Sequence, residues 1–145
     1  MKKLFLAVLM VFPFFACESS ESKVIDFSAL PAVAQKFVKT HFADKTISVV
    51  YSEKDLFDHE YEVVFEDGSS VEFNGDGQWK DIEVKTAPGV PEKAMPAAIV
   101  NYVKAKHPAN FVKQISKEKK EYEVDLNNGV DIVFDRNGNF KRYDD

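Results

Sequence analysis

Two segments of the chain space their apolar residues as amphipathic helices do. In each segment apolar positions recur at i, i+3, i+4 and i+7, which is the period of one helix face. These positions are Leu30, Val33, Ala34, Phe37 and Val38 in the first segment, and Met95, Ala98, Ile99, Tyr102 and Val103 in the second. Pro31 and Pro96 each follow the first apolar residue, where the missing N–H costs a helix little. The pattern therefore predicts one helix near each proline.

After each helix the apolar period changes to two, as in a strand with one buried face. The alternating positions are Ile47, Val49, Tyr51, Tyr61, Val63, Phe65, Val71 and Phe73 in the first half, and Tyr122, Val124, Leu126, Ile132 and Phe134 in the second. Asp67-Gly68 and Asn128-Gly129 separate neighbouring strands, and Asn, Asp and Gly accept the positive φ of tight hairpin turns. Each half therefore predicts an antiparallel meander.

The two halves resemble each other in sequence. Tyr61-Glu62-Val63 recurs 61 residues later, whereas Leu30-Pro31-Ala32 recurs 65 residues later, so the first half has four extra residues between Lys54 and Glu60. We predict an α+β fold made of a tandem repeat of a helix plus a four-stranded antiparallel meander. The repeats are expected at residues 24–85 and 90–145, with the helices packed on one face and the meanders side by side or in one continuous sheet.

The N-terminal segment has the pattern of an export signal. Lys2 and Lys3 precede an apolar run from Leu4 to Ala16, and a polar stretch follows at residues 18–23. A charged start, an apolar middle and a polar exit are those of a secretory signal peptide, and the run is shorter than the roughly 20 residues of a membrane-spanning helix. We predict a signal peptide at 1–16, a polar tether at 17–23 and an exported protein, either periplasmic or anchored to the outer membrane.

Cys17 is the only cysteine, so it has no internal disulfide partner. Phe14-Phe15-Ala16-Cys17 resembles a bacterial lipobox, although Phe14 departs from the leucine preferred there. The resemblance implies that Cys17 is lipidated, becomes the mature N-terminus and attaches the protein to a membrane. The other interpretation is a free thiol left by a different cleavage.

Charge restricts the class of partner. Loss of residues 1–16 removes two lysines and no acid, which changes the formal charge from −5 to −7. Without a basic patch to neutralise phosphates, nucleic acid is not an expected partner. An acidic surface does not favour anionic lipid either, so membrane attachment is expected through acyl chains at Cys17.

The chain has no motif for catalysis, a cofactor or a metal. His41, His59 and His107 have no nucleophile at a recognisable spacing, and two of them stand at predicted helix ends, where a cation suits the helix dipole. Asn74-Gly75-Asp76-Gly77 resembles the start of a calcium loop, but its twelfth position is Lys85 instead of a bidentate Glu. We interpret these residues as a turn and predict no enzyme, no cofactor and no metal site.

Several motifs together resemble a known family. The Tyr-Glu-Val strand, the Asp-Gly turn and Phe73-Asn74-Gly75-Asp76-Gly77-Gln78-Trp79 occur in this order and recur in the second half. From about Val24 to Asp145 the chain resembles the PepSY-like, β-lactamase-inhibitor-like proteins exported by Bacteroides-type bacteria. The resemblance implies a binding module, with an unidentified envelope or secreted protein as partner and inhibition of an enzyme as its activity. The alternative is an envelope carrier or sensor for a small ligand or ion.

The four extra residues supply the predicted partner contact. Leu56 and Phe57 are apolar in a hairpin loop, where polar residues are usual, and Asp55 and Asp58 flank them. An apolar centre with a charged rim is typical of an interface. The alternative is that Phe57 folds back to cover the sheet edge.

Trp79 and the acidic strand positions each allow two interpretations. Trp79, the only tryptophan, corresponds to Phe140 in the second half, so it is either a core residue or a binding residue. Charged residues alternate with apolar ones along the strands, either as the solvated face of a one-sided sheet or as a docking surface. They are Glu60, Glu62, Glu66, Lys119, Glu121 and Glu123.

Overall fold

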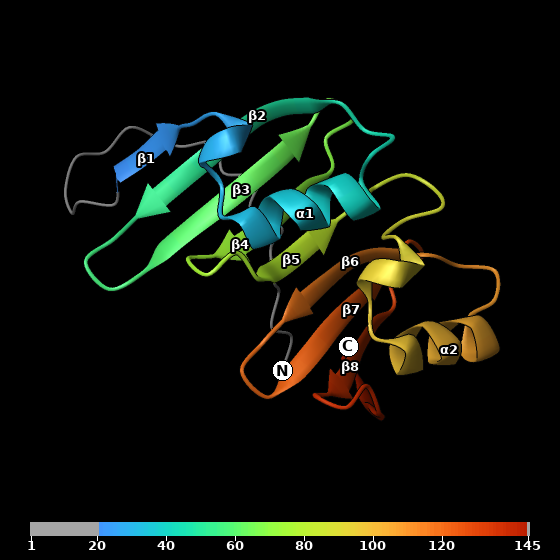
Figure 1. Cartoon of the computed structure of the whole chain (residues 1–145). Helices are drawn as coiled ribbons and strands as arrows, with labels where there is room; N and C mark the ends of the chain where they lie inside the picture. The colour runs from blue at the N-terminus through green and yellow to red at the C-terminus, as the bar shows by residue number, and fades with distance from the viewer. Residues whose placement is uncertain (1–20, 145) are drawn as a thin grey trace.

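The computed structural model describes residues 21–144 and places their nine strands in one antiparallel sheet (Figure 1), in the order β1 to β9. The strands are β1 (Glu21–Val24), β2 (Ile47–Lys54), β3 (His59–Phe65), β4 (Ser70–Asn74), β5 (Trp79–Glu83), β6 (Val112–Lys117), β7 (Glu121–Leu126), β8 (Asp131–Asp135) and β9 (Phe140–Asp144). The helices are α1 (Ala32–His41) and α2 (Ala97–Lys106), each preceded by a 3-10 turn, η1 (Phe27–Ala29) and η2 (Glu92–Ala94).

The predicted tandem repeat of helix plus four-stranded meander is wrong. β5 pairs with β6, with Ile82 opposite Ile115, so the sheet continues through the point where the sequence suggested a boundary. β1, at residues predicted to be a polar tether, adds a further strand beside β2. The physical reason is that two separate meanders would each leave an additional edge strand with unpaired backbone N–H and C=O groups. Pairing β5 with β6 gives these groups hydrogen-bond partners.

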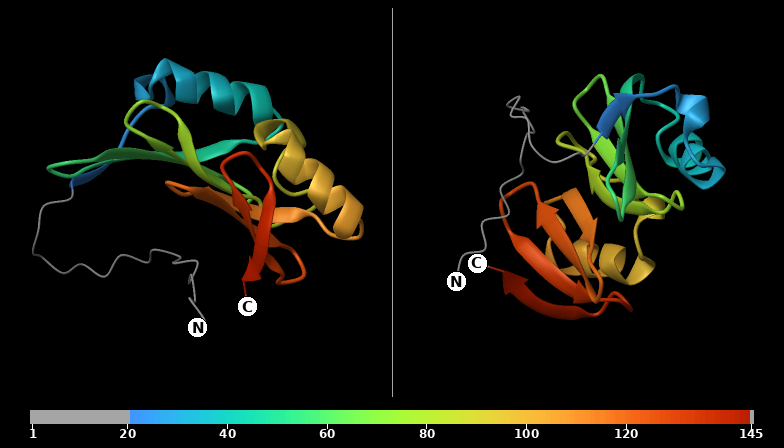
Figure 2. Two further views of the ribbon diagram at one scale, coloured as in Figure 1. Left: turned by 90° about the horizontal axis from the view of Figure 1, so that it is seen from below. Right: turned by 90° about the vertical axis from the view of Figure 1, so that its left-hand side faces the viewer.

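Both helices lie on the same face of this twisted sheet (Figure 2), and the core lies between them and the strands. Aromatic residues link the layers: the rings of Phe42 and Phe65 stack at 5.1 Å, and Tyr102 meets Phe134 edge-on at 5.3 Å. Ile82 and Ile115, on either side of the β5–β6 seam, are fully buried in the same core cluster. One core therefore serves the whole sheet.

The helices are short and follow the pattern of their residues. Each begins immediately after a proline, Pro31 or Pro96, and has ten residues. Basic side chains occupy the last turns, Lys39 and His41 in α1 and Lys104 and Lys106 in α2, where they complement the helix dipole. Among residues 21–144, no helix is long and apolar enough to cross a membrane.

Candidate functional site

Strand alternation places three carboxylates side by side on the sheet face opposite the helices. Val63, Val71 and Ile82 point into the core from β3, β4 and β5. The neighbouring Glu62, Glu72 and Asp81 therefore point to the other face. Glu62 lies opposite Glu72, and Glu72 lies opposite Asp81. We call these three carboxylates the acidic row.

Charge is unfavourable along the acidic row. Partial desolvation at the sheet surface, followed by the charges of Asp81, Glu62 and Glu60, raises the pKa of Glu72 to about 7. Desolvation and then Asp81 also raise the pKa of Glu62. Like charges directly opposite each other on a sheet repel, so a cation placed here would relieve the repulsion.

Hydrogen bonds hold one end of the row. Asp81 accepts from Gln114 Nε2 at 2.9 Å and from Ser116 Oγ, both on β6. Desolvation nevertheless raises the pKa of Asp81, because it outweighs these bonds. The β5–β6 seam therefore positions one carboxylate of the row.

A nearby basic side chain is bound to another acid. Lys80, which lies beside Asp81 in β5, pairs with Glu60. Within residues 21–144, no ion pair includes a member of the acidic row. The row is thus an uncompensated negative stripe on a face that neither helix covers (Figure 2).

The residues that resemble a calcium loop form turns, as interpreted from the sequence. Asn74 Oδ1 accepts from the backbone N–H groups of Asp76 and Gln78, each at 3.0 Å. Asp135 Oδ1 accepts in the same way from Asn137 and Asn139. Over the described part of the chain, no three His, Cys, Asp or Glu side chains are arranged to hold a metal ion.

The β2–β3 hairpin carries Leu56 and Phe57 at its tip, where these residues are 83% and 96% exposed. The alternative in which Phe57 folds over the sheet edge is therefore wrong. Whether the tip binds a partner stays a prediction.

The four extra residues lengthen this hairpin instead of enlarging its loop. The N–H of Asp55 donates to the carbonyl of Asp58 at 2.9 Å, and the β6–β7 hairpin closes in the same way between Glu118 and Glu121. Both turns therefore have two residues at the tip. The first hairpin is longer because two more residue pairs, ending with Lys54 opposite His59, precede its turn.

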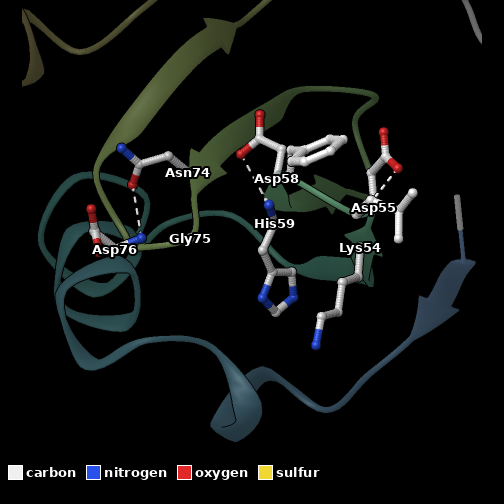
Figure 3. A pocket seen from close by; sticks show the side chains of 9 residues that line it. Lys54, Asp55, Asp58, His59, Asn74, Gly75 and Asp76 are labelled. Atoms are coloured by element: carbon white, nitrogen blue, oxygen red, sulfur yellow. Dashed lines mark hydrogen bonds between the residues drawn. The ribbon is translucent and has the colours of Figure 1, made fainter.

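A pocket of about 420 Å³ lies between the hairpin tip and the β4–β5 turn, lined by residues 54–59 and 74–76 (Figure 3). At its base, His59 Nε2 is 2.8 Å from Ser52 Oγ, and its Nδ1 is 3.3 Å from the Tyr61 hydroxyl. The pocket is open and has several charged residues in its wall. It therefore lacks the closed apolar form of a typical small-ligand site.

Trp79 and Asp58 occupy different surroundings. Asp58 lines the pocket with Leu56 and Phe57. Trp79 packs partly buried against the core, with Lys117 Nζ 4.0 Å from its ring centroid, and it does not line the pocket. The structure thus brings together three of the four predicted binding residues.

Comparisons with known proteins show the family. The family described as "Putative beta-lactamase-inhibitor-like, PepSY-like" matches residues 59–142. A crystal structure of a "putative calcium-regulated periplasmic protein" from Bacteroides thetaiotaomicron is 36% identical, with a TM-score of 0.81, over 86% of this chain and 97% of that one. A periplasmic protein from Bacteroides vulgatus is 37% identical, with a TM-score of 0.80, over 86% and 98%. None of the curated proteins matches.

The shared sheet and these relatives define an exported, periplasmic protein. The chain belongs to the PepSY-like, β-lactamase-inhibitor-like family. The family and the periplasmic localisation predicted from the sequence are therefore confirmed. Cys17 and the predicted signal peptide lie outside the described residues, so the lipid anchor stays a prediction.

Glu72→Gln is expected to stabilise the protein at pH 8 more than at pH 5. A carboxyl whose pKa is raised in the folded state adds stability below its ordinary pKa, and that stability is lost as the pH rises through about 7. The amide of Gln is uncharged at both pH values and so avoids this loss. Solvent screens the exposed side chain and limits the effect, so we expect a gain of about 2–4 °C in Tm at pH 8. Thermal melts at both pH values measure it. Glu66→Gln, outside the row, is the control, and an equal effect of both variants would contradict the prediction.

Proposed function

We propose that this chain is a lipid-anchored binding module of the periplasm that holds a protein partner on the acidic row, and that it inhibits a secreted or envelope enzyme without being a catalyst. The observation that carries the proposal is the row itself: Glu62, Glu72 and Asp81 stand in cross-strand register on the face that neither helix covers, and none of them forms an ion pair with another of residues 21–144. A partner that presents lysine or arginine gains complementary charge here.

The dimensions of the row suit a protein segment. Neighbouring strands lie about 4.8 Å apart, so three strands spread the carboxylates over roughly 10 Å, the width of one basic loop. The sheet face around the row offers the broad contact that protein interfaces use. The family description, β-lactamase-inhibitor-like, supports inhibition as the consequence of binding.

A second candidate function is a calcium sensor. It is favoured by the description of the Bacteroides thetaiotaomicron protein as calcium-regulated. Against it, no three His, Cys, Asp or Glu side chains among the described residues are arranged to hold a metal ion. Protein binding is therefore the first candidate, and calcium becomes one condition of the test.

Affinity capture with matched variants tests the proposal. The leaderless protein is immobilised through Cys17 and exposed to periplasmic and secreted extracts of the source bacterium, with and without calcium. The variant Glu62→Gln, Glu72→Gln, Asp81→Asn is expected to retain about a tenth or less of the captured partner, because it removes the complementary charge. Captured enzymes are then assayed with and without the free protein.

The control variant Asp26→Asn, Asp44→Asn, Glu66→Gln removes the same charge from exposed positions outside the row. This control variant is expected to capture as much of the partner as the unmodified protein does. Capture should also be stronger at pH 8 than at pH 6, since Glu72 is ionised above about 7. Equal loss in both variants would show that only net charge matters. Calcium binding without partner capture would favour the sensor.

A further inference from the structure

The register of β1 places the N-terminal side of the described chain beside the hairpin tip. Glu21 lies opposite Lys54, the last residue of β2. Leu56 and Phe57 follow within three residues. The chain that leads into β1 therefore arrives at the end of the sheet where these two apolar side chains are exposed.

The distance to the proposed anchor is short. Cys17 precedes Glu21 by four residues, and four residues span at most about 14 Å even when fully extended. An acyl anchor at Cys17 consequently holds this end of the sheet close to the lipid surface. Ile47, at the opposite end of β2 and seven positions from Lys54, lies about 23 Å further off.

The hairpin tip has the form of a membrane contact. Leu56 and Phe57 lie in the turn between β2 and β3 and are exposed, outside the core cluster. The flanking carboxylates of Asp55 and Asp58 accept hydrogen bonds from the N–H groups of Leu56 and His59. Both acids thus bond to the backbone of the turn, and Leu56 and Phe57 are exposed between them.

We infer that Leu56 and Phe57 enter the bilayer surface beside the anchor, so that the protein holds the membrane by two contacts. The inference rests on the anchor at Cys17 in the proposed function. Apolar side chains that enter the boundary of the bilayer add buried apolar area to the attachment that the acyl chains at Cys17 supply. Two contacts also fix the orientation of the protein on the membrane, with the turn between β2 and β3 directed toward the lipid. The lipid is zwitterionic, because the protein is acidic.

Depth-dependent fluorescence tests the inference. The protein that begins at Cys17 is coupled by this single thiol to maleimide lipid in phosphatidylcholine vesicles with brominated acyl chains. Phe57→Trp is combined with Trp79→Phe, which leaves one tryptophan as reporter. The lipid is expected to quench it severalfold more than a reporter made by Ala43→Trp in the same background, because exposed Ala43 lies beyond the opposite end of β2.

The outcomes separate the contact from the anchor. Chemical coupling supplies an anchor whether or not the cell acylates Cys17, and the mass of the native protein reports acylation independently. Adding Leu56→Ser should reduce quenching at position 57 while Tm stays unchanged, because the side chain is exposed. Quenching at position 57 no greater than at position 43 would overturn the inference and return the tip to a protein contact.

Discussion

Gly89→Ala is expected to lower the free energy of unfolding by about 3 kcal/mol or more, because a positive φ and a steric overlap act together. Gly89 has φ +82°, and a Cβ there would overlap the carbonyl oxygen of Val112 and lie 2.6 Å from Phe111 Cδ2. That oxygen also accepts from the N–H of Val90 at 2.9 Å. It cannot move away without loss of the bond that joins the connecting segment to β6.

Gly129→Ala is the matched control for this prediction. Gly129 has φ +85°, but a Cβ there would have no atom within 4 Å, so only the backbone cost of about 1–2 kcal/mol remains. Urea denaturation of the two variants measures the difference. Equal losses would mean that β6 shifts to accept the methyl group.

Truncation after Lys85 is expected to abolish cooperative folding of the remaining fragment. The cut removes β6, so β5 becomes an open edge and the fully buried Ile82 loses Ile115 as its neighbour across the seam. A fragment of about 60 residues buries a smaller share of its surface than the whole chain does. Circular dichroism against temperature measures the transition. A sharp melt near that of the whole protein would show two independent units.

Ile115→Ala provides a companion variant that keeps the chain whole. It is expected to cost about 3 kcal/mol, as a buried large-to-small change does. Trp79 lies in β5 at the seam, with Lys117 of β6 over its ring, so its fluorescence reports loss of the packing between the two halves. In a single cooperative unit the unfolding transitions seen by fluorescence and by circular dichroism shift together in the variant. A fluorescence transition at the same place as in the unmodified protein would contradict a single shared core.

The apolar periods predicted the helices and most strands but left open whether the two meanders lie side by side or form one continuous sheet, which is the arrangement observed. The proline and glycine of residues 85–91 indicated a boundary, whereas the pairing of Ile82 with Ile115 depends on contacts between distant residues. β1 was missed because Glu21–Val24 has a single apolar residue and no alternation.

The acidic row was partly accessible from the sequence. Glu62 was singled out as a charged strand position, but counting back from a two-residue turn at Asp67-Gly68 would set it opposite Phe73. The hairpin closes between Phe65 and Ser69, and this longer loop sets Glu62 opposite Glu72. Asp81 could not be placed in this way, because a register shift at Glu72 and Phe73 changes the count between β4 and β5. The exposure of Phe57 required the turn geometry, which apolar patterning does not contain.

The β2–β3 hairpin can change in length only by certain steps if the side chains at its tip are to keep their direction. Side chains alternate between the two faces of a strand, so adding one residue pair before a turn reverses the face toward which the tip is directed. Two pairs restore it. Four residues are therefore the smallest insertion that lengthens the hairpin and keeps Leu56 and Phe57 directed toward the same face. Hairpins that preserve this direction should differ in length by multiples of four residues.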